Sequence, residues 1–279
     1  MHSNQLLRAL LCGLLTVLTG AIMAQCGTTI PREHVDSPTI LEGQQRETIQ
    51  YDLDRTLSVH IYIVASGLDT YDYSAADYEP NWEIVNENFA PLGLSFEICS
   101  ETLIPNYQFN FITDYDEPQN GFRTDADLMS EYYTDNVINV YYVQDILSST
   151  GIPAAGYAYF PGGPDCIVLE KTHGDLTIEH ELGHFFGLYH TFETSMGNEF
   201  VDGSNCATTG DLVCDTPADN DGNLDGCQYD DLSTDGNGEH YTPYTSNIMS
   251  YYGVCRCKFT NGQFNRMAAI YLAERNYLW

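Results

Sequence analysis

The sequence predicts an α+β fold built from two lobes. Short apolar segments with strand or helix periodicity alternate between residues 57 and 170. A stretch rich in Asp, Gly and Asn then runs to about residue 245, and one amphipathic helix closes the chain. At 279 residues with 43% hydrophobic content, the chain is long enough to bury a sizeable core.

The first lobe is expected to combine a sheet with helices. Apolar alternation or continuous apolar runs predict strands at 57–65, 94–100, 136–146, 156–160 and 166–170. Apolar residues at helical spacing predict helices at 80–92 and 125–133. A third helix should begin near Gly174 or Asp175 and end at Gly187, because glycine commonly ends helices at positive φ.

The second lobe is expected to be mostly loops, with a helix at its end. Thr260 is a suitable N-cap for that helix, and Phe264, Met267 and Tyr271 form its apolar stripe. The predicted domain therefore spans residues 51–279, with an upper lobe at about 51–187 and a lower lobe at about 188–279.

The first fifty residues are predicted to be a signal peptide followed by a pro-segment or leader. Arg8, an apolar run from Ala9 to Met23 and a small Ala24 predict a cleaved secretory signal at 1–24. An uncleaved anchor is the competing interpretation, although the run is shorter than the ~20 residues that span a membrane. Residues 25–50 are polar and aperiodic, which indicates a pro-segment or leader.

Charge and cysteine content indicate which partners the protein can bind and in which compartment it works. Ten Lys and Arg against forty Asp and Glu give a net charge of −30 at pH 7, which disfavours nucleic acid and anionic membranes as partners. Nine cysteines in an exported chain favour disulfides. We expect a secreted, extracellular or periplasmic protein with no membrane attachment after signal cleavage; the sequence does not indicate its oligomeric state.

HELGHFFGLYH, at 180–190, predicts a catalytic zinc site. His180 and His184 lie one helical turn apart on the same face, and Glu181 lies beside them. A turn at Gly187 allows His190 to return as a third ligand. Three imidazoles with one open position are typical of catalytic zinc, and Glu181 is placed to act as general base and acid on a zinc-activated water.

The same eleven residues match the metzincin motif H-E-x-x-H-x-x-G-x-x-H, and NIMSYYG supplies the methionine turn of that group. The chain resembles the pappalysin (cytophagalysin) family through GYAYFPGGPD, GLYHTF, CDTPAD, NIMSY and FTNGQFNRM. The resemblance implies an endopeptidase whose cleft separates a twisted sheet with helices from an irregular lower lobe. It also implies that Tyr251 hydrogen-bonds the oxyanion, while Met249 forms a packing floor.

Two other functions fit the same residues. One is a secreted, metal-stabilised binding module without catalysis, against which the retained Glu181 argues. The other is a zinc hydrolase of non-peptide amides. GYAYF at 156–160, as an edge strand that pairs with extended substrate, favours a peptide or protein substrate.

Calcium is a second expected cofactor. Asp219, Asp221 and Asp225 alternate as in a calcium loop, although Leu224 stands where an EF-hand has glycine, and a solvated acidic loop fits equally. The family resemblance instead implies calcium near Asp215 and Thr216.

The resemblance also implies roles for cysteines. It implies a lower-lobe bridge between Cys206 and Cys227, followed by one from Cys214 to Cys255 or Cys257. Cys26, in a Cys-Gly-Thr sequence, resembles the thiolate that holds such precursors latent by occupying zinc. A disulfide and a lipid anchor are the alternatives for Cys26.

Overall fold

The computed structural model describes residues 25–26, 28, 48–67, 71–113, 121–147, 153–172, 174–220 and 227–279, without the side chains of 25–26 and 174–176. The predicted signal at 1–24, most of the leader and the calcium candidates Asp221 and Asp225 lie outside these residues. None of the helices within them is long and apolar enough to cross a membrane.

A six-stranded mixed sheet forms the upper lobe, in the order β1-β7-β8-β5-β2-β3. All neighbouring strands are parallel except β7 and β8, which are antiparallel. The strands are β1 (Gln25–Cys26), β2 (Arg55–Val64), β3 (Leu94–Ile104), β5 (Ile138–Val143), β7 (Ala154–Ala158) and β8 (Cys166–Glu170). A separate parallel pair joins β4 (Phe111–Thr113) to β6 (Asp145–Leu147).

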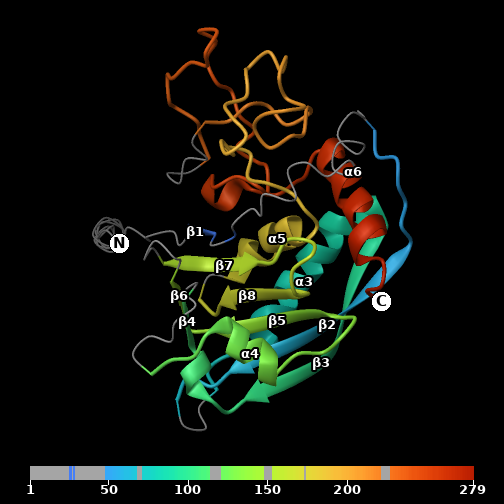
Figure 1. Ribbon diagram of the computed structural model, residues 1–279, viewed down its shortest axis with the longest axis vertical. Helices are drawn as coiled ribbons and strands as arrows, with labels where there is room; N and C mark the ends of the chain where they lie inside the picture. Colours follow the sequence, from blue (N-terminus) through green and yellow to red (C-terminus); the bar gives the residue numbers. More distant parts are fainter. Residues whose placement is uncertain are drawn as a thin grey trace, which may run out of the picture.

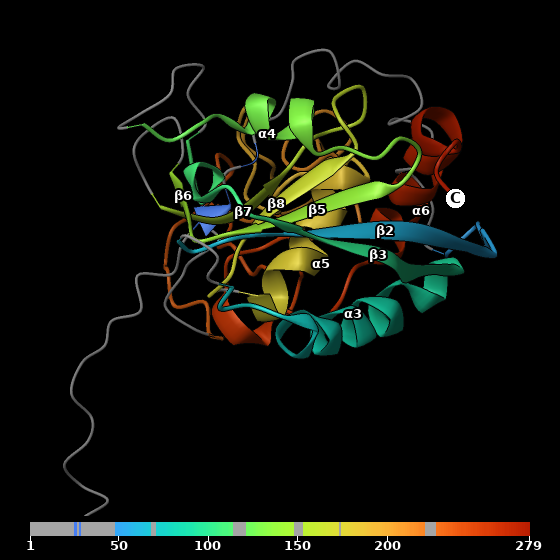
Figure 2. The ribbon, with the colours of Figure 1, turned by 90° about the horizontal axis from the view of Figure 1, so that it is seen from below.

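Helices cover both faces of the sheet. Figure 2 shows α3 (Ala75–Phe89) and α5 (Gly174–Phe185) on one face and α4 (Asp125–Glu131) on the other. Short 3-10 turns follow α3 at Ala90–Leu92 and precede β4 at Tyr107–Phe109. α5 packs against β7, β8 and α3, so the helix that carries the histidines is held by the sheet.

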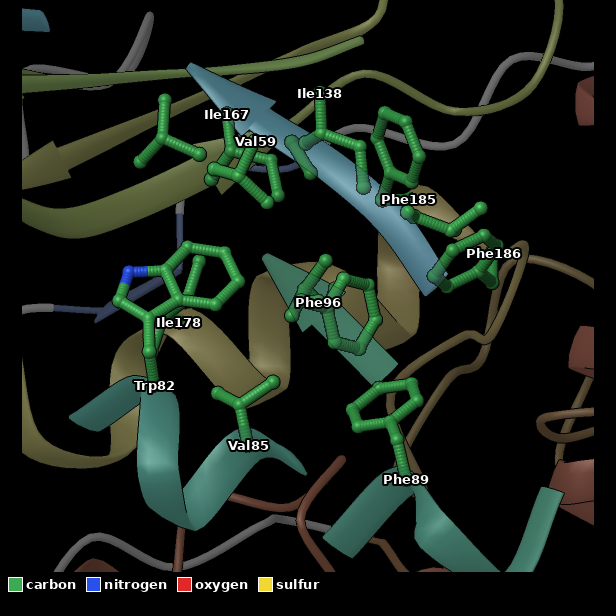
Figure 3. Close-up of a cluster of buried hydrophobic side chains, with 14 of the residues drawn as sticks. Val59, Trp82, Val85, Phe89, Phe96, Ile138, Ile167, Ile178, Phe185 and Phe186 are labelled. Atoms are coloured by element: carbon green, nitrogen blue, oxygen red, sulfur yellow. The ribbon is translucent and has the colours of Figure 1, made fainter. Parts of the chain in front are cut away.

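Strand periodicity divides the core into two apolar layers. On β2, Leu57, Val59, Ile61 and Ile63 face α3 and α5, whereas Tyr62 and Val64 face the side of α4. Figure 3 shows Val59, Ile138 and Ile167 from the sheet meeting Trp82, Val85 and Phe89 of α3 and Ile178 and Phe185 of α5. Burial of this layer fixes the position of α5.

Most predicted elements of the upper lobe are confirmed, with shifted bounds. The strand predicted at 166–170 coincides with β8, whereas the run at 136–146 is divided into β5 and β6. α3 begins at Ala75 instead of 80, because Ser74 and Asp77 form a capping box ahead of Pro80. Gly187 has φ of 84° just beyond α5, as the sequence predicts.

The lower lobe is irregular, as expected. Figure 1 shows its loops, drawn from yellow-orange to orange, on the side of α5 opposite the sheet. Among its described residues, the regular elements are the 3-10 turn Gly253–Cys255, α6 (Asn261–Ile270) and a π-helical turn at Tyr271–Arg275. Thr260 caps α6 in a capping box with Gln263, which confirms the predicted start of that helix. The α+β, two-lobed prediction therefore holds.

The disulfide pairings differ from those expected. Cys206 is bonded to Cys214 and Cys227 to Cys255, so the Cys206–Cys227 prediction is wrong and Cys214 has neither predicted partner. Local turns explain the first bridge. Hydrogen bonds from Cys206 N to the Gly203 oxygen and from Gly210 N to the Gly197 oxygen fold the chain back, so the Cys206 and Cys214 Cα atoms lie 5.0 Å apart.

Candidate active site

The end of α5 brings three histidines together. His180 and His184 project from the helix, and Gly187 then takes positive φ while Leu188 N donates to the Gly183 oxygen at 2.9 Å. A Cβ on Gly187 would also lie 2.9 Å from Ile270 Cγ1, so glycine meets both a conformational and a steric demand. This turn returns His190 to the face of the helix.

The three imidazoles point their Nε2 atoms at one another. Their Nε2 atoms lie 3.1 Å (His180–His184 and His184–His190) and 3.2 Å (His190–His180) apart. Nδ1 of His180 faces the Ile248 oxygen at 2.7 Å, and Nδ1 of His184 faces the Leu188 oxygen at 2.8 Å. Carbonyl oxygens only accept, so both Nδ1 atoms carry the hydrogen and both Nε2 atoms present lone pairs. Facing lone pairs need a cation between them, and a set of three neutral imidazoles suits zinc.

Burial keeps these rings neutral. His180 and His184 are almost fully buried, and desolvation lowers the pKa of His184 to about 4. Desolvation, followed by the neighbouring imidazoles, also lowers the pKa values of His180 and His190 well below the ordinary value. Neutral imidazole is the form that binds metal.

The methionine turn lies directly beneath this set. Met249 is fully buried, and its Sδ is the atom that a side chain at Gly183 would meet, so glycine permits the close approach. Thr191 N donates to the Met249 oxygen at 3.1 Å, which joins the turn to the residue after His190. The Tyr251 hydroxyl lies 3.1 Å from His190 Nε2, at the edge of the ligand set.

Glu181 is fully buried and contacts the segment predicted to be a leader. Thr28 Oγ1 donates to Glu181 Oε2 at 3.0 Å and accepts from Ala158 N at 3.0 Å. β1 pairs in parallel with the outer edge of β7, with Cys26 opposite Gly156. The described residues 25, 26 and 28 of the predicted leader thus lie along the GYAYF strand edge at which extended substrate is expected, and Thr28 contacts the candidate base. The Cys26 side chain lies outside the described residues.

The calcium candidates have separate environments. Asp215 accepts from Thr260 Oγ1 and Gly262 N, both at 2.8 Å, so it stabilises the start of α6. Asp219 accepts from two hydroxyls, Thr191 Oγ1 and Tyr252 Oη.

Thr216 lies in a different, buried acidic cluster. Its side chain is buried close to Asp211, whose Oδ2 has no hydrogen-bond partner. Glu199 is also buried nearby, and burial followed by the charge of Asp211 raises its pKa to about 8.

Sequence reasoning found the histidines, Glu181 and Tyr251 but missed three features. Thr28 stands two residues after Cys26 in the Cys-Gly-Thr sequence, but the resemblance implies a role only for the cysteine. The link from Asp219 to Thr191 and Tyr252 has no spacing signature, because its partners are 28 and 33 residues away. Glu199 and Asp211 are acidic residues in a chain with forty, and only their burial sets them apart.

Comparison with known proteins identifies the family. The Peptidase_M43 family model, described as pregnancy-associated plasma protein-A, matches residues 123–272, more than half of the chain. An extracellular metalloprotease of Arthroderma benhamiae is 28% identical over 272 residues, covering 90% of this chain and 91% of its own length. Extracellular metalloprotease 1 of Coccidioides posadasii is 26% identical over 270 residues, with 88% of each chain covered.

A solved structure shares the fold. Mature mirolysin of Tannerella forsythia, in complex with a cleaved peptide, matches with a TM-score of 0.52 and 20% identity over 80% of this chain and 91% of its own. The resemblance drawn from the sequence motifs is therefore confirmed, and the chain belongs to the Peptidase_M43 (pregnancy-associated plasma protein-A) family and is a metalloendopeptidase.

Proposed function

We propose that this protein is a secreted zinc endopeptidase in which His180, His184 and His190 hold the metal and Glu181 transfers the proton. The observation that carries the proposal is the convergence of three Nε2 atoms within 3.2 Å, two of them on buried side chains, one residue along the helix from a buried carboxylate. When bound there, zinc supplies Lewis-acid activation of water and of the scissile carbonyl.

The chain's own residues account for the remaining steps. A Glu181 carboxylate oxygen removes a proton from the attacking water and returns it to the leaving amine nitrogen. The Tyr251 hydroxyl, 3.1 Å from His190 Nε2, donates a hydrogen bond to the oxygen that becomes negative in the transition state. The free edge of β7, once the leader has left, binds the extended substrate by main-chain pairing.

The decisive test replaces Glu181 with Gln in the zinc-loaded enzyme after leader removal. Cleavage of a peptide library should fall by roughly 10²–10⁴-fold, the usual contribution of a general base, at unchanged zinc content. Glu179→Gln is the matched control, because Glu179 is a buried carboxylate on the same helix that accepts from Asn88 Nδ2 at 2.5 Å instead of facing Thr28. Cleavage that survives Glu181→Gln would remove the proposed role of Glu181.

The two competing functions make different predictions in the same assay. A metal-stabilised binding module would cleave no peptide in any form, and a non-peptide amide hydrolase would cleave small amides in preference to the library. The family favours peptide or protein substrates, and the edge of β7 offers them a pairing surface.

Secretion and latency belong to the same proposal. The relatives are named extracellular metalloproteases, and two disulfides suit an oxidising compartment. Residues 1–24 then act as the signal, 25 to about 50 as an inhibitory leader and 51–279 as the catalytic domain. The leader's pairing with β7 and its Thr28 contact with Glu181 support inhibition by occupation of the cleft.

Latency is tested with three forms of the protein at equal zinc loading. The full chain after signal cleavage should be nearly inactive, whereas removal of residues 25 to about 50 should activate it. Cys26→Ala should be active without that cut if its thiolate is the blocking ligand. Equal activity in all three forms would exclude an inhibitory leader.

We propose that calcium binds the buried cluster of Glu199, Asp211 and Thr216. Two buried carboxylates and a buried hydroxyl are hard oxygen ligands, and a divalent cation would let both acids ionise. Asp215 already accepts two hydrogen bonds at the start of α6, and calcium near Asp215 stays a prediction. Calcium titration of chelator-treated protein by calorimetry tests the proposal, and absence of a binding isotherm would refute it.

A further inference from the structure

Asp219 connects the two chain segments that carry His190 and Tyr251. We propose that this carboxylate is a positioning residue, which sets the third metal ligand and the oxyanion tyrosine relative to each other. The inference rests on the proposed function, because it assigns Asp219 a part in the same zinc site.

Asp219 accepts two short hydrogen bonds from hydroxyl groups. Thr191 Oγ1 donates to Oδ2 at 2.9 Å, and Tyr252 Oη donates to Oδ1 at 2.9 Å. All three side chains are buried, with exposed fractions of 4% for Thr191, 7% for Asp219 and 0% for Tyr252. Each oxygen of one carboxylate therefore holds a different segment.

Those segments immediately follow the two functional residues. Thr191 is the residue after His190, and Tyr252 is the residue after Tyr251. The segments already meet at two points, where Thr191 N donates to the Met249 oxygen at 3.1 Å and where Tyr251 Oη lies 3.1 Å from His190 Nε2. Asp219 adds a third connection, through one hydrogen bond to each segment.

A carboxylate suits this task better than any neutral group. It accepts with both oxygens, and hydrogen bonds to an ionised acceptor are shorter and about twice as strong as neutral ones. An asparagine would offer one acceptor oxygen and one NH₂ group, which cannot accept from the second hydroxyl. Asp219→Asn should therefore release one segment while conserving the volume of the side chain.

The two hydroxyls allow each segment to be released separately. Thr191→Val removes the bond on the His190 side, so zinc should be lost to a competing chelator about tenfold more readily, in the range known for groups that orient metal ligands. Tyr252→Phe removes the bond on the Tyr251 side, so kcat should fall by about tenfold with KM and zinc retention unchanged. Asp219→Ala should show both defects in one variant.

A buried acid elsewhere in the lower lobe provides the control. Asp235 is also 7% exposed, and its carboxylate accepts from Val201 N, Asn237 N and Glu239 N. Asp235→Asn should lower the melting temperature but leave zinc retention and kcat as in the wild type. The comparison separates loss of positioning from loss of stability.

The measurements are zinc retention against a chelator, kcat and KM on one peptide, and melting temperature, all on the zinc-loaded enzyme. The inference fails if Thr191→Val and Tyr252→Phe each alter both readouts equally, or if Asp219→Ala behaves as Asp235→Asn does. It also fails if Asp219→Ala abolishes calcium binding while zinc retention and kcat stay at wild-type values. A wild-type enzyme that holds no zinc would overturn the proposed function itself, which the wild-type measurement reveals before any variant is made.

Discussion

The two lobes hold their parts of the site by different means. The upper lobe fixes α5 through apolar layers on both faces of a six-stranded sheet, and the described part of its core is almost entirely hydrophobic. The lower lobe has little regular structure before α6. Some of its apolar residues join the same core, and two disulfides and buried acids that accept hydrogen bonds tie its loops together. His180, Glu181 and His184 thus lie on a helix that hydrophobic burial holds, whereas His190 and Tyr251 lie on loops that polar contacts also hold.

The largest effect should come from the ligand that crosses between the lobes. His190→Ala leaves two imidazoles on α5 and removes the one supplied by the lower lobe, so zinc and activity should be lost together. Metal analysis and peptide cleavage check this on the same preparation. Full zinc occupancy in the variant would show that the lower lobe is not needed to hold the metal.

The core of the upper lobe should respond next most strongly. Phe89 is fully buried against Phe96, Phe186 and Phe259, so Phe89→Ala should lower the free energy of unfolding by about 3–5 kcal/mol. Ile84, 40% exposed on the same helix, is the control, and Ile84→Ala should change stability by about 0.5 kcal/mol or less. Urea unfolding measures both, and similar losses would contradict the assignment of the core.

In the lower lobe, each disulfide should raise the free energy of unfolding by an amount that grows with the length of chain between its two cysteines. Cys227–Cys255 spans 28 residues, and its replacement by serines should cost about 3–4 kcal/mol by loop-closure entropy. Cys206–Cys214 spans 8 residues, and the same replacement should cost about 2.5 kcal/mol. Thermal unfolding of the two double variants shows which loses more stability. A larger loss for the Cys206–Cys214 variant would mean that local contacts, and not loop closure, determine the stabilisation.

The same contrast explains what the sequence could predict. Alternating apolar residues in β2 and β8 specify which face each side chain takes, and HELGHFFGLYH specifies three ligands through helix geometry and one glycine. The lower lobe has no comparable period, so its contacts depend on where turns bring the chain. The bridge from Cys206 to Cys214 and the hydroxyls that meet Asp219 therefore could not be read from spacing.

Stability should depend on pH through the acids of the lower lobe. Burial raises the pKa of Asp211 to about 7 from 3.8, and burial with the charge of Asp211 raises that of Glu199 to about 8 from 4.5. The folded chain then keeps two protons that the unfolded chain releases, so without calcium the stability that these two groups contribute should be greatest below about pH 4 and should fall as pH rises towards 8. Added calcium should raise the melting temperature more at pH 8 than at pH 5.

One double variant separates this effect from other ionisations. Glu199→Gln with Asp211→Asn should flatten the fall between pH 5 and pH 8 in calcium-free buffer, because neither group then titrates. An unchanged slope in that double variant would assign the pH dependence to other groups.

The smallest effect should come from one contact between the predicted leader and the site, the hydrogen bond from Thr28 to Glu181. Thr28→Val removes the hydroxyl that Glu181 and Ala158 share, and one hydrogen bond contributes about 0.5–1.5 kcal/mol. The uncut chain should therefore show a residual activity that is raised up to about tenfold, because the leader leaves the β7 edge more often. Thr28→Ser keeps the hydroxyl and should match wild type, and all three chains should become equally active once the leader is removed. If Thr28→Val stays as inactive as wild type before the cut, the leader is held by contacts other than the one to the catalytic carboxylate, and polar contact at the lobe boundary does not govern access to the site.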